Sequence, residues 1–227
     1  MKVVILAAGL GNRLGNAVPK PLTQLGNGRS MMDMQVRTVS DLVGRDHVFV
    51  VVGFKKELIM ELFGDLTFIY NPRFTRENTA KSLLRALRKI DDDVLWLNGD
   101  VVCTPAVVSA VLQHGKSCMA VTAGVVGEEE VKYLLDPKTG CISEVSKEVV
   151  NGLGEAVGVN LVRREDLARF RTHLEACADN DYFERGLQSA VADGLLLYAV
   201  EVDAKQCVEV DFPADLERAN ALITHWV

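Results

Sequence analysis

Several features that would place this chain in other protein classes are absent from its 227 residues. Its five cysteines are scattered and none forms a C-x-x-C pair, so reduced thiols are expected rather than disulfides or a zinc site. No apolar run is long enough to cross a bilayer. The net charge of −6 disfavours broad electrostatic binding to nucleic acid. We therefore expect a cytoplasmic protein that binds neither membranes nor nucleic acid.

The chain also has few aromatic residues and few histidines, which limits the kinds of site that it can form. Aromatic residues make up only 6% of the chain, and the four histidines are not paired with a nucleophile or a set of metal ligands. The run "VVILAAGL" after Lys2 is similar to a short signal peptide, but Arg13 follows it quickly. A buried parallel strand explains the same residues more simply.

Apolar β-branched runs alternate with helical patterns through the first half of the chain. This alternation predicts an α/β fold with a doubly wound, mostly parallel, Rossmann-like sheet. In such a sheet the first strand lies beside the fourth, and ligands bind outside the carboxyl ends of the strands. The loop after Ala8 and the loop that holds Asp100 should therefore face each other across one crevice. Strands are expected at 3–8, 47–53, 66–70 and 93–100, and helices at 31–42 (capped by Ser30), 79–87 and from Pro105.

The second half has a different pattern and predicts a mixed-sheet extension that builds the other side of the crevice. A hairpin is expected at 132–147, with Pro137 and Gly140 in its turn. The remaining expected elements are strands at 155–162, 196–202 and 207–211, and helices at 166–177, 182–191 and from Pro213.

The opening segment "MKVVILAAGLGNRLGNAVPKPL" contains more glycine than a structural turn needs. Gly9, Gly11 and Gly15 form only a loose dinucleotide fingerprint, which is weak by itself. No acidic residue closes the second strand, and Pro-Lys-Pro stands where a Rossmann helix should run. We interpret the segment as a loop that wraps a triphosphate, with backbone N–H groups pointing inward and Arg13 and Lys20 as the cations.

Five motifs, in order along the chain, carry a family resemblance. "LAAGLGNRLG…PKPL" resembles the signature loop of the sugar-phosphate nucleotidyltransferases. Two others, "YNPRFTRENTAKSLLRAL" and "ISEVSK…GEAVGVNLV", resemble the phosphocholine and inositol-phosphate cytidylyltransferase-like branch of that family. "LNGDVV" resembles the metal-binding Gly-Asp, and "VEVDFPADLERA" resembles the second metal-binding Asp with the helix that follows it.

This resemblance implies a nucleotidyltransferase fold and a reaction. The family joins a nucleoside monophosphate to a phosphorylated sugar or alcohol and releases pyrophosphate. The branch implies a Mg²⁺-dependent enzyme that transfers CMP from CTP to a phosphorylated small-molecule acceptor. Residues 1–125 would be the nucleotide-binding half and residues 126–227 the acceptor-binding half of a single domain, and a homodimer is compatible with this interpretation.

Several alternatives stay open at this point. Recognition of choline needs an aromatic cage, which the low aromatic content disfavours. Inositol phosphate, glycerol phosphate, an aminoalkyl phosphonate and a sugar phosphate remain as acceptors. A sugar-1-phosphate uridylyl- or guanylyltransferase and a non-catalytic nucleotide-sensing subunit are the rival functions.

The resemblance also implies a site. Asp100 and Asp211 would hold Mg²⁺, although the first could be a turn residue and the second a helix cap. Arg13 and Lys20 would be catalytic. The nucleotide would contact Leu6, Ala7, Ala8, Gly9, Gly11, Asn78 and Ser82, and the acceptor would contact Lys147, Glu155, Asn160 and Tyr182.

Overall fold

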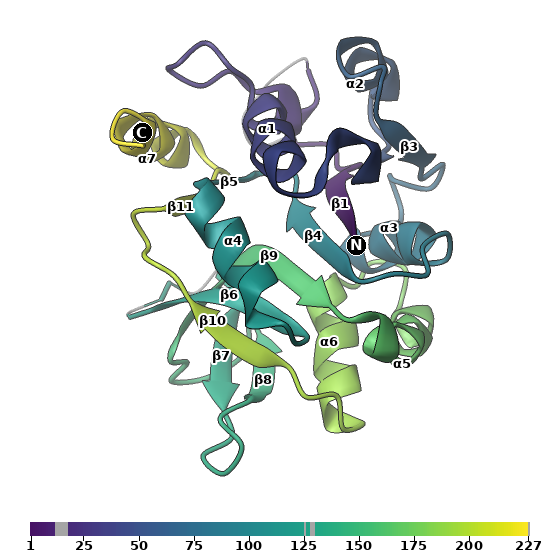
Figure 1. Cartoon of the computed structure of the whole chain (residues 1–227), viewed down its shortest axis with the longest axis vertical. Coiled ribbons are helices and arrows are strands. Elements are labelled where there is room, and N and C mark those ends of the chain that lie inside the picture. The colour runs from purple at the N-terminus through teal and green to yellow at the C-terminus, as the bar shows by residue number, and fades with distance from the viewer. Residues whose placement is uncertain (12–17, 125, 128–129, 227) are drawn as a thin grey trace.

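The computed structural model of the chain describes residues 1–11, 18–124, 126–127 and 130–226. Its described residues form a nine-stranded sheet with helices on both faces (Figure 1). Seven strands follow one another in the order β10-β6-β9-β4-β1-β2-β3, and β7 and β8 branch from β9. These strands are β1 (Lys2–Ala7), β2 (Val48–Val52), β3 (Thr67–Tyr70), β4 (Val94–Asn98), β6 (Cys118–Ala123), β7 (Lys132–Leu135), β8 (Ile142–Ser146), β9 (Gly154–Val162) and β10 (Tyr198–Glu201).

The parallel part of the sheet is the part that the sequence predicts. β1 pairs in parallel with β2 on one side and with β4 on the other, and β2 pairs in parallel with β3. The first strand therefore lies beside the fourth, as expected. Residues 3–7 of β1 are buried on both faces, which explains why that strand is continuously apolar.

The second half of the chain enters the middle of this sheet. β9 lies between β4 and β6 and is antiparallel to both. The predicted hairpin is formed by β7 and β8, and β7 continues onto β9 through the pair Lys132 and Glu155. β6 is a strand that was not predicted from the sequence, although all but the last of its residues are buried.

Helices cover the two faces in two layers (Figure 1). Helices α1 (Met31–Val43), α2 (Lys56–Leu62) and α4 (Pro105–His114) pack on one face. Helices α3 (Thr79–Leu87), α5 (Arg164–Ala176) and α6 (Phe183–Ala192) pack on the other, around Trp96, Phe170 and Phe183. Ser30 caps α1 as expected, because its side chain accepts a hydrogen bond from the Asp33 N–H.

A two-stranded ribbon beside the main sheet completes the fold. It joins β5 (Val101–Cys103) and β11 (Cys207–Glu209) in antiparallel pairing. The last helix, α7 (Pro213–Ile223), packs over this ribbon on a third apolar cluster that contains Val102, Val208 and Val210. Within the described residues, no helix is both long and apolar enough to cross a membrane.

Candidate active site

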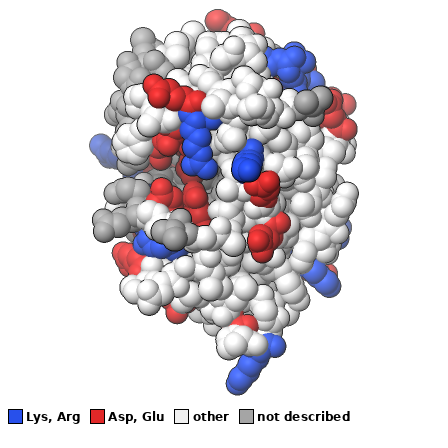
Figure 2. Space-filling view, turned by 90° about the vertical axis from the view of Figure 1, so that its left-hand side faces the viewer, with Lys and Arg blue, Asp and Glu red and all other residues white. Residues whose placement is uncertain are grey.

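A cavity of about 660 Å³ opens at the carboxyl ends of β1 and β4, where the prediction placed a crevice. Both halves of the chain line it. Figure 2 shows basic and acidic side chains gathered around a hollow on one face of the molecule. The predicted site residues that line this cavity are Leu6, Gly9, Gly11, Lys20, Asn78, Asp100, Lys147, Glu155, Tyr182 and Asp211.

Lys20 forms ion pairs with both predicted metal ligands, Asp100 and Asp211. Its Nζ lies 2.6 Å from Oδ2 of Asp100 and 2.5 Å from Oδ1 of Asp211. The side chain of Lys20 is only 12% exposed, and those of Asp100 and Asp211 are 22% and 35% exposed. The fold thus gathers one cation and two carboxylates from three distant segments into one partly buried cluster.

Strand pairing explains why Asp100 and Asp211 meet. In the β5–β11 ribbon, Glu209 lies opposite Val101. The next hydrogen bond runs from the Val210 N–H to the Asp100 carbonyl, over 3.0 Å. Asp100, just before β5, and Asp211, shortly after β11, are therefore brought side by side at the same end of this ribbon.

The loop that carries Asp100 is held by a buried amide. Nε2 of Gln35 on α1, a residue that is 2% exposed, donates to the carbonyls of Asn98 and Val101 at 2.7 and 2.6 Å. Gly99 in this loop cannot carry a side chain without movement, because a Cβ there would lie 2.4 Å from the Leu6 carbonyl oxygen. These contacts fix the backbone of the loop against β1 and α1.

The segment that carries Lys20 is equally constrained. Lys20–Leu22 forms a single 3₁₀ turn that follows Pro19 and buries Pro21. Gly11 packs directly on this turn with a φ of +63°, and a Cβ there would lie 2.6 Å from the Cβ of Lys20. Gly11 therefore has both a conformational and a steric reason to be glycine. Arg13, the other predicted cation, and Gly15 lie outside the described residues.

The charges of the cluster shift its proton equilibria. Burial lowers the pKa of Lys20, but attraction and hydrogen bonding from Asp100 and Asp211 outweigh it and raise the pKa above 10.5. Lys20 is therefore a cation at neutral pH. Burial, with repulsion from the same two aspartates, raises the pKa of Glu209 well above its usual range.

The alternative role of Asp211 as a helix cap is not the one that the structure shows. Phe212 is the N-cap residue of α7. The side chain of Asp215 accepts hydrogen bonds from the N–H groups of Asp211 and Phe212, at 3.1 and 2.8 Å. Asp215 thus stabilises the start of α7, and the carboxylate of Asp211 faces Lys20 instead.

The predicted nucleotide contacts divide into two groups. Asn78 lines the cavity and also caps α3, because its Oδ1 accepts from the Thr79 N–H at 2.8 Å. Ser82 is 5% exposed and lies outside the cavity lining, where its hydroxyl accepts a hydrogen bond from Asn71 at 3.1 Å. Ala7 and Ala8 are buried in the two cores, also outside the lining.

The predicted acceptor contacts divide similarly. Nζ of Lys147 lies 5.7 Å from the centre of the Tyr182 ring, and both residues line the cavity with Glu155. Burial and repulsion from Glu130 raise the pKa of Glu155. Asn160 is fully buried within β9 and lies outside the lining.

The charged lining residues that were not among the predicted site residues are Glu130, Glu184, Glu209, Asp215 and Arg218. Glu184 follows Tyr182 and Phe183 at the start of α6, and all three residues line the cavity. Phe183 also packs edge-on against Trp96 in the core. Burial, only partly offset by Lys147, raises the pKa of Glu184 to about 7.

The cluster around Lys20 has donor groups that suit a divalent cation. Oδ1 of Asp100 is buried and has no hydrogen-bond partner among the described residues. Mg²⁺ is commonly held by one or two carboxylates together with substrate phosphates. The same described residues contain no group of three or more His, Cys, Asp or Glu side chains arranged to hold a metal without a substrate.

Sequence comparison gives a family and several relatives. A family model for the MobA-like NTP transferase domain matches residues 3–188. The chain is 38% identical over 119 residues to a CMP-5'-(3-aminopropyl)phosphonate synthase of Streptomyces rubellomurinus, which covers 48% of this chain and 18% of the relative. It is 35% identical over 247 residues to the bifunctional protein GlmU of Paramagnetospirillum magneticum, which covers 98% of this chain and 52% of the relative. The chain thus spans about half or less of these relatives.

Structural comparison shows the same fold in solved proteins. The CTP:phosphocholine cytidylyltransferase LicC of Streptococcus pneumoniae superposes with a TM-score of 0.81 at 16% identity, over 98% of both chains. The inositol-1-phosphate CTP transferase of T. maritima superposes with a TM-score of 0.80 at 17% identity, over 97% of this chain and 95% of that one. At these identities the likeness concerns the fold.

Proposed function

Because the chain belongs to the MobA-like NTP transferase family, we propose that it transfers CMP from CTP to a phosphorylated small alcohol or a phosphonate and releases pyrophosphate. The observation that carries this proposal is the cluster of Lys20, Asp100 and Asp211 in a cavity lined by both halves of the chain. The similarity to a CMP-aminopropylphosphonate synthase and the folds of two CTP-using enzymes support CTP as the nucleotide.

The reaction needs no covalent intermediate with the protein. An oxygen of the acceptor's phosphate or phosphonate attacks the α-phosphorus of CTP. The bond from that phosphorus to the β-phosphate oxygen breaks, and pyrophosphate leaves with the electron pair. Since both partners are anions, catalysis consists mainly of positioning and charge neutralisation.

Lys20 is the described residue best placed to act on the phosphates. Its pKa is raised, so its ammonium group stays charged, and it lies beside the glycine loop at the cavity wall. We expect Lys20 to shift part of its contact from the two aspartates to the leaving phosphates. Arg13, if its guanidinium also reaches the triphosphate, would add a second cation to the same task.

Asp100 and Asp211 are the residues that would hold Mg²⁺. The unpartnered Oδ1 of Asp100 and the proximity of both carboxylates to one cation fit such an ion. When bound, the ion would neutralise charge on the triphosphate. In the ligand-free chain the ammonium group of Lys20 neutralises part of the charge of the same two carboxylates.

The acceptor side of the cavity offers groups for both ends of a small molecule. Lys147 is a cation for the acceptor's phosphate or phosphonate. Glu155 and Glu184 line the cavity with Lys147, and they supply oxygen acceptors for a hydroxyl or an amine. Tyr182, 49% exposed, provides an aromatic face beside them.

One activity grid tests this proposal. Pyrophosphate release would be measured with CTP, UTP, GTP and ATP against phosphocholine, 3-aminopropylphosphonate, inositol 1-phosphate, glycerol 3-phosphate and glucose 1-phosphate. We expect CTP to be the best nucleotide, with an alcohol phosphate or a phosphonate as acceptor. Activity confined to UTP or GTP with the sugar phosphate would favour the rival sugar-nucleotide function. No turnover in any pair would favour a nucleotide-sensing role.

A further inference from the structure

Hydrogen bonds hold the start of α3 against the loop before α6 at the edge of the cavity. The backbone N–H groups of Asn78 and Ala80 donate to the carbonyls of Asp179 and Asp181, at 2.8 and 3.2 Å. A helix cannot satisfy the N–H groups of its own first turn. The loop before α6 therefore supplies acceptors that α3 lacks.

A second hydrogen bond joins the two segments in the opposite direction, from the start of α6 to α3. The N–H of Phe183, the first residue of α6, donates to the hydroxyl of Thr79 at 3.0 Å. We name these contacts between residues 78–80 and 179–183 the α3–α6 junction. It has a cavity-lining residue on each side, Asn78 on one and Tyr182 on the other. Asn78 also donates from its Nδ2 to the Asn180 carbonyl at 3.3 Å, so the geometry of the junction sets how the lining residues of the two segments lie relative to each other.

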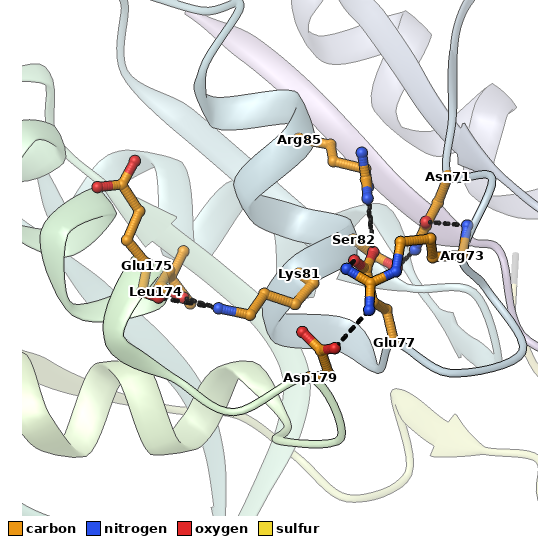
Figure 3. A network of polar contacts seen from close by, with 9 residues as sticks. All are labelled: Asn71, Arg73, Glu77, Lys81, Ser82, Arg85, Leu174, Glu175 and Asp179. Atoms are coloured by element: carbon orange, nitrogen blue, oxygen red, sulfur yellow. Dashed lines mark hydrogen bonds and ion pairs between the residues drawn. The ribbon is translucent and has the colours of Figure 1, made fainter.

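A charged network behind the junction holds it in place, and Figure 3 shows its members. The side chain of Glu77 is only 4% exposed and lies between two arginines. Its Oε1 is 3.2 Å from Nη1 of Arg73, and its Oε2 is 2.8 Å from Nη2 of Arg85. Arg73 also reaches across to the other loop, where its Nη2 donates to Oδ2 of Asp179 at 2.6 Å.

Stability alone is a weak reason for this network. Burying a carboxylate costs free energy, and a buried ion pair is often no more stabilising than apolar residues of the same size. The pair between Arg73 and Asp179 is half exposed, which limits its contribution further. Yet the fixed fork of Arg73 connects the carboxylate beside Asn78 to the loop that leads to Tyr182.

We infer that Glu77 and Asp179 are positioning residues, which hold Asn78 and Tyr182 in a fixed position relative to each other at the edge of the cavity. The inference rests on the proposed function, in which the nucleotide lies on the Asn78 side and the acceptor on the Tyr182 side. Neither Glu77 nor Asp179 lines the cavity, so each acts through the junction. In a reaction that depends on alignment, displacement of one substrate by about 1 Å lowers the rate on the order of a hundredfold.

The chain provides a matched control for the pair that crosses the junction. Arg88, at the end of α3, and Glu175, in α5, form another ion pair at 2.9 Å, with side chains that are 57% and 50% exposed. Arg73 and Asp179 are each 50% exposed. The changes Asp179→Asn and Glu175→Gln therefore remove the same kind of exposed ion pair. Only the first pair lies at the junction.

The first measurement is amide hydrogen exchange in the wild-type chain and in Glu77→Gln, Asp179→Asn and Glu175→Gln. Glu77→Gln should speed exchange at Ala80 and Phe183 by about tenfold or more, because it removes charge-assisted contacts from a buried group. Asp179→Asn should speed it by roughly twofold to fivefold, and Glu175→Gln should leave it unchanged. Unchanged exchange in Glu77→Gln and Asp179→Asn would overturn the inference whatever the activity.

The second measurement separates positioning from folding. With the best substrate pair of the wild-type enzyme, Glu77→Gln should lower kcat by about tenfold or more. Its KM for each substrate should stay within about threefold, because each wall keeps its own contacts. A wild-type kcat with faster exchange would show that the junction is structural only. If the wild-type chain turns over no pair, the proposed function fails, and the exchange data alone decide whether the network fixes the junction.

Discussion

At the scale of single residues, Lys20 is the cation that contacts the two aspartates of the cavity. Asp100 and Asp211 contact its Nζ, and Glu209 lies two residues from Asp211 on the ribbon strand. Without a cation, these carboxylates would repel one another in a partly buried place. The raised pKa of Lys20 shows that their attraction outweighs the cost of burying its ammonium group.

Glu184 allows a prediction about pH at the same scale. Burial raises its pKa to about 7 from an ordinary value of 4.5. The folded state therefore binds this proton more tightly than the unfolded state, and the stability it contributes is lost as the pH rises from about 4.5 through 7. In the ligand-free chain, replacing Glu184 by Gln should remove on the order of 2 kcal/mol of the fall in unfolding free energy between pH 5 and pH 8.

Denaturant unfolding at the two pH values measures this difference directly. The change Glu165→Gln, at an exposed position in the first turn of α5, is the control and should leave the pH dependence as in the wild type. Parallel stability profiles for the wild type and Glu184→Gln would show that Glu184 titrates normally.

At the scale of elements, the loop after β4 and the β5–β11 ribbon create the site. Gln35 is the clearest example of one element that positions another, because its amide crosses from α1 to two carbonyls of the loop that carries Asp100. Replacement by an apolar side chain of similar size would leave both carbonyls without that donor.

We therefore expect Gln35→Leu to lower the unfolding free energy by about 1–3 kcal/mol. It should also lower pyrophosphate release more strongly than this loss of stability explains, because Asp100 loses its fixed position. Gln24→Leu is the matched control, since Gln24 is exposed and its amide makes a long, weak hydrogen bond of 3.5 Å to the Leu22 carbonyl. Full activity in a folded Gln35→Leu variant would mean that the loop holds Asp100 without this amide.

Element patterns also explain which parts of the fold could be predicted. Long apolar strands such as β1 and β4 can be predicted from their apolar runs, and the known topology of doubly wound sheets then places them side by side. β11 confirms the strand expected at 207–211, but no strand was predicted at β5, and the pairing of these two short strands depends on residues about a hundred positions apart. The likeness of "VEVD" to a family motif indicated Asp211, but only the ribbon register explains why it meets Asp100.

At the scale of the whole molecule, both halves of the chain build one cavity. Lys20 and Asn78 come from the first half, and Lys147, Tyr182 and Asp211 come from the second. The division at residue 125 and a homodimer stay predictions. Ser82 and Asn160 show the limit of transferring motifs: both lie within family motifs, but their side chains lie in the interior, as the periods of α3 and β9 dictate.

The central claim is that Lys20, Asp100 and Asp211 form one catalytic unit. The most direct test is kcat/KM for pyrophosphate release, measured in the wild type, Asp100→Asn, Asp211→Asn and the double variant, over a range of Mg²⁺ concentrations. Asp203→Asn, at an exposed loop position outside the cavity lining, is the control. We predict a loss of about a hundredfold or more in each single variant, and a double variant within about threefold of the weaker single one, because members of a unit are not additive. Wild-type activity in Asp211→Asn, or single losses that multiply in the double variant, would contradict this account.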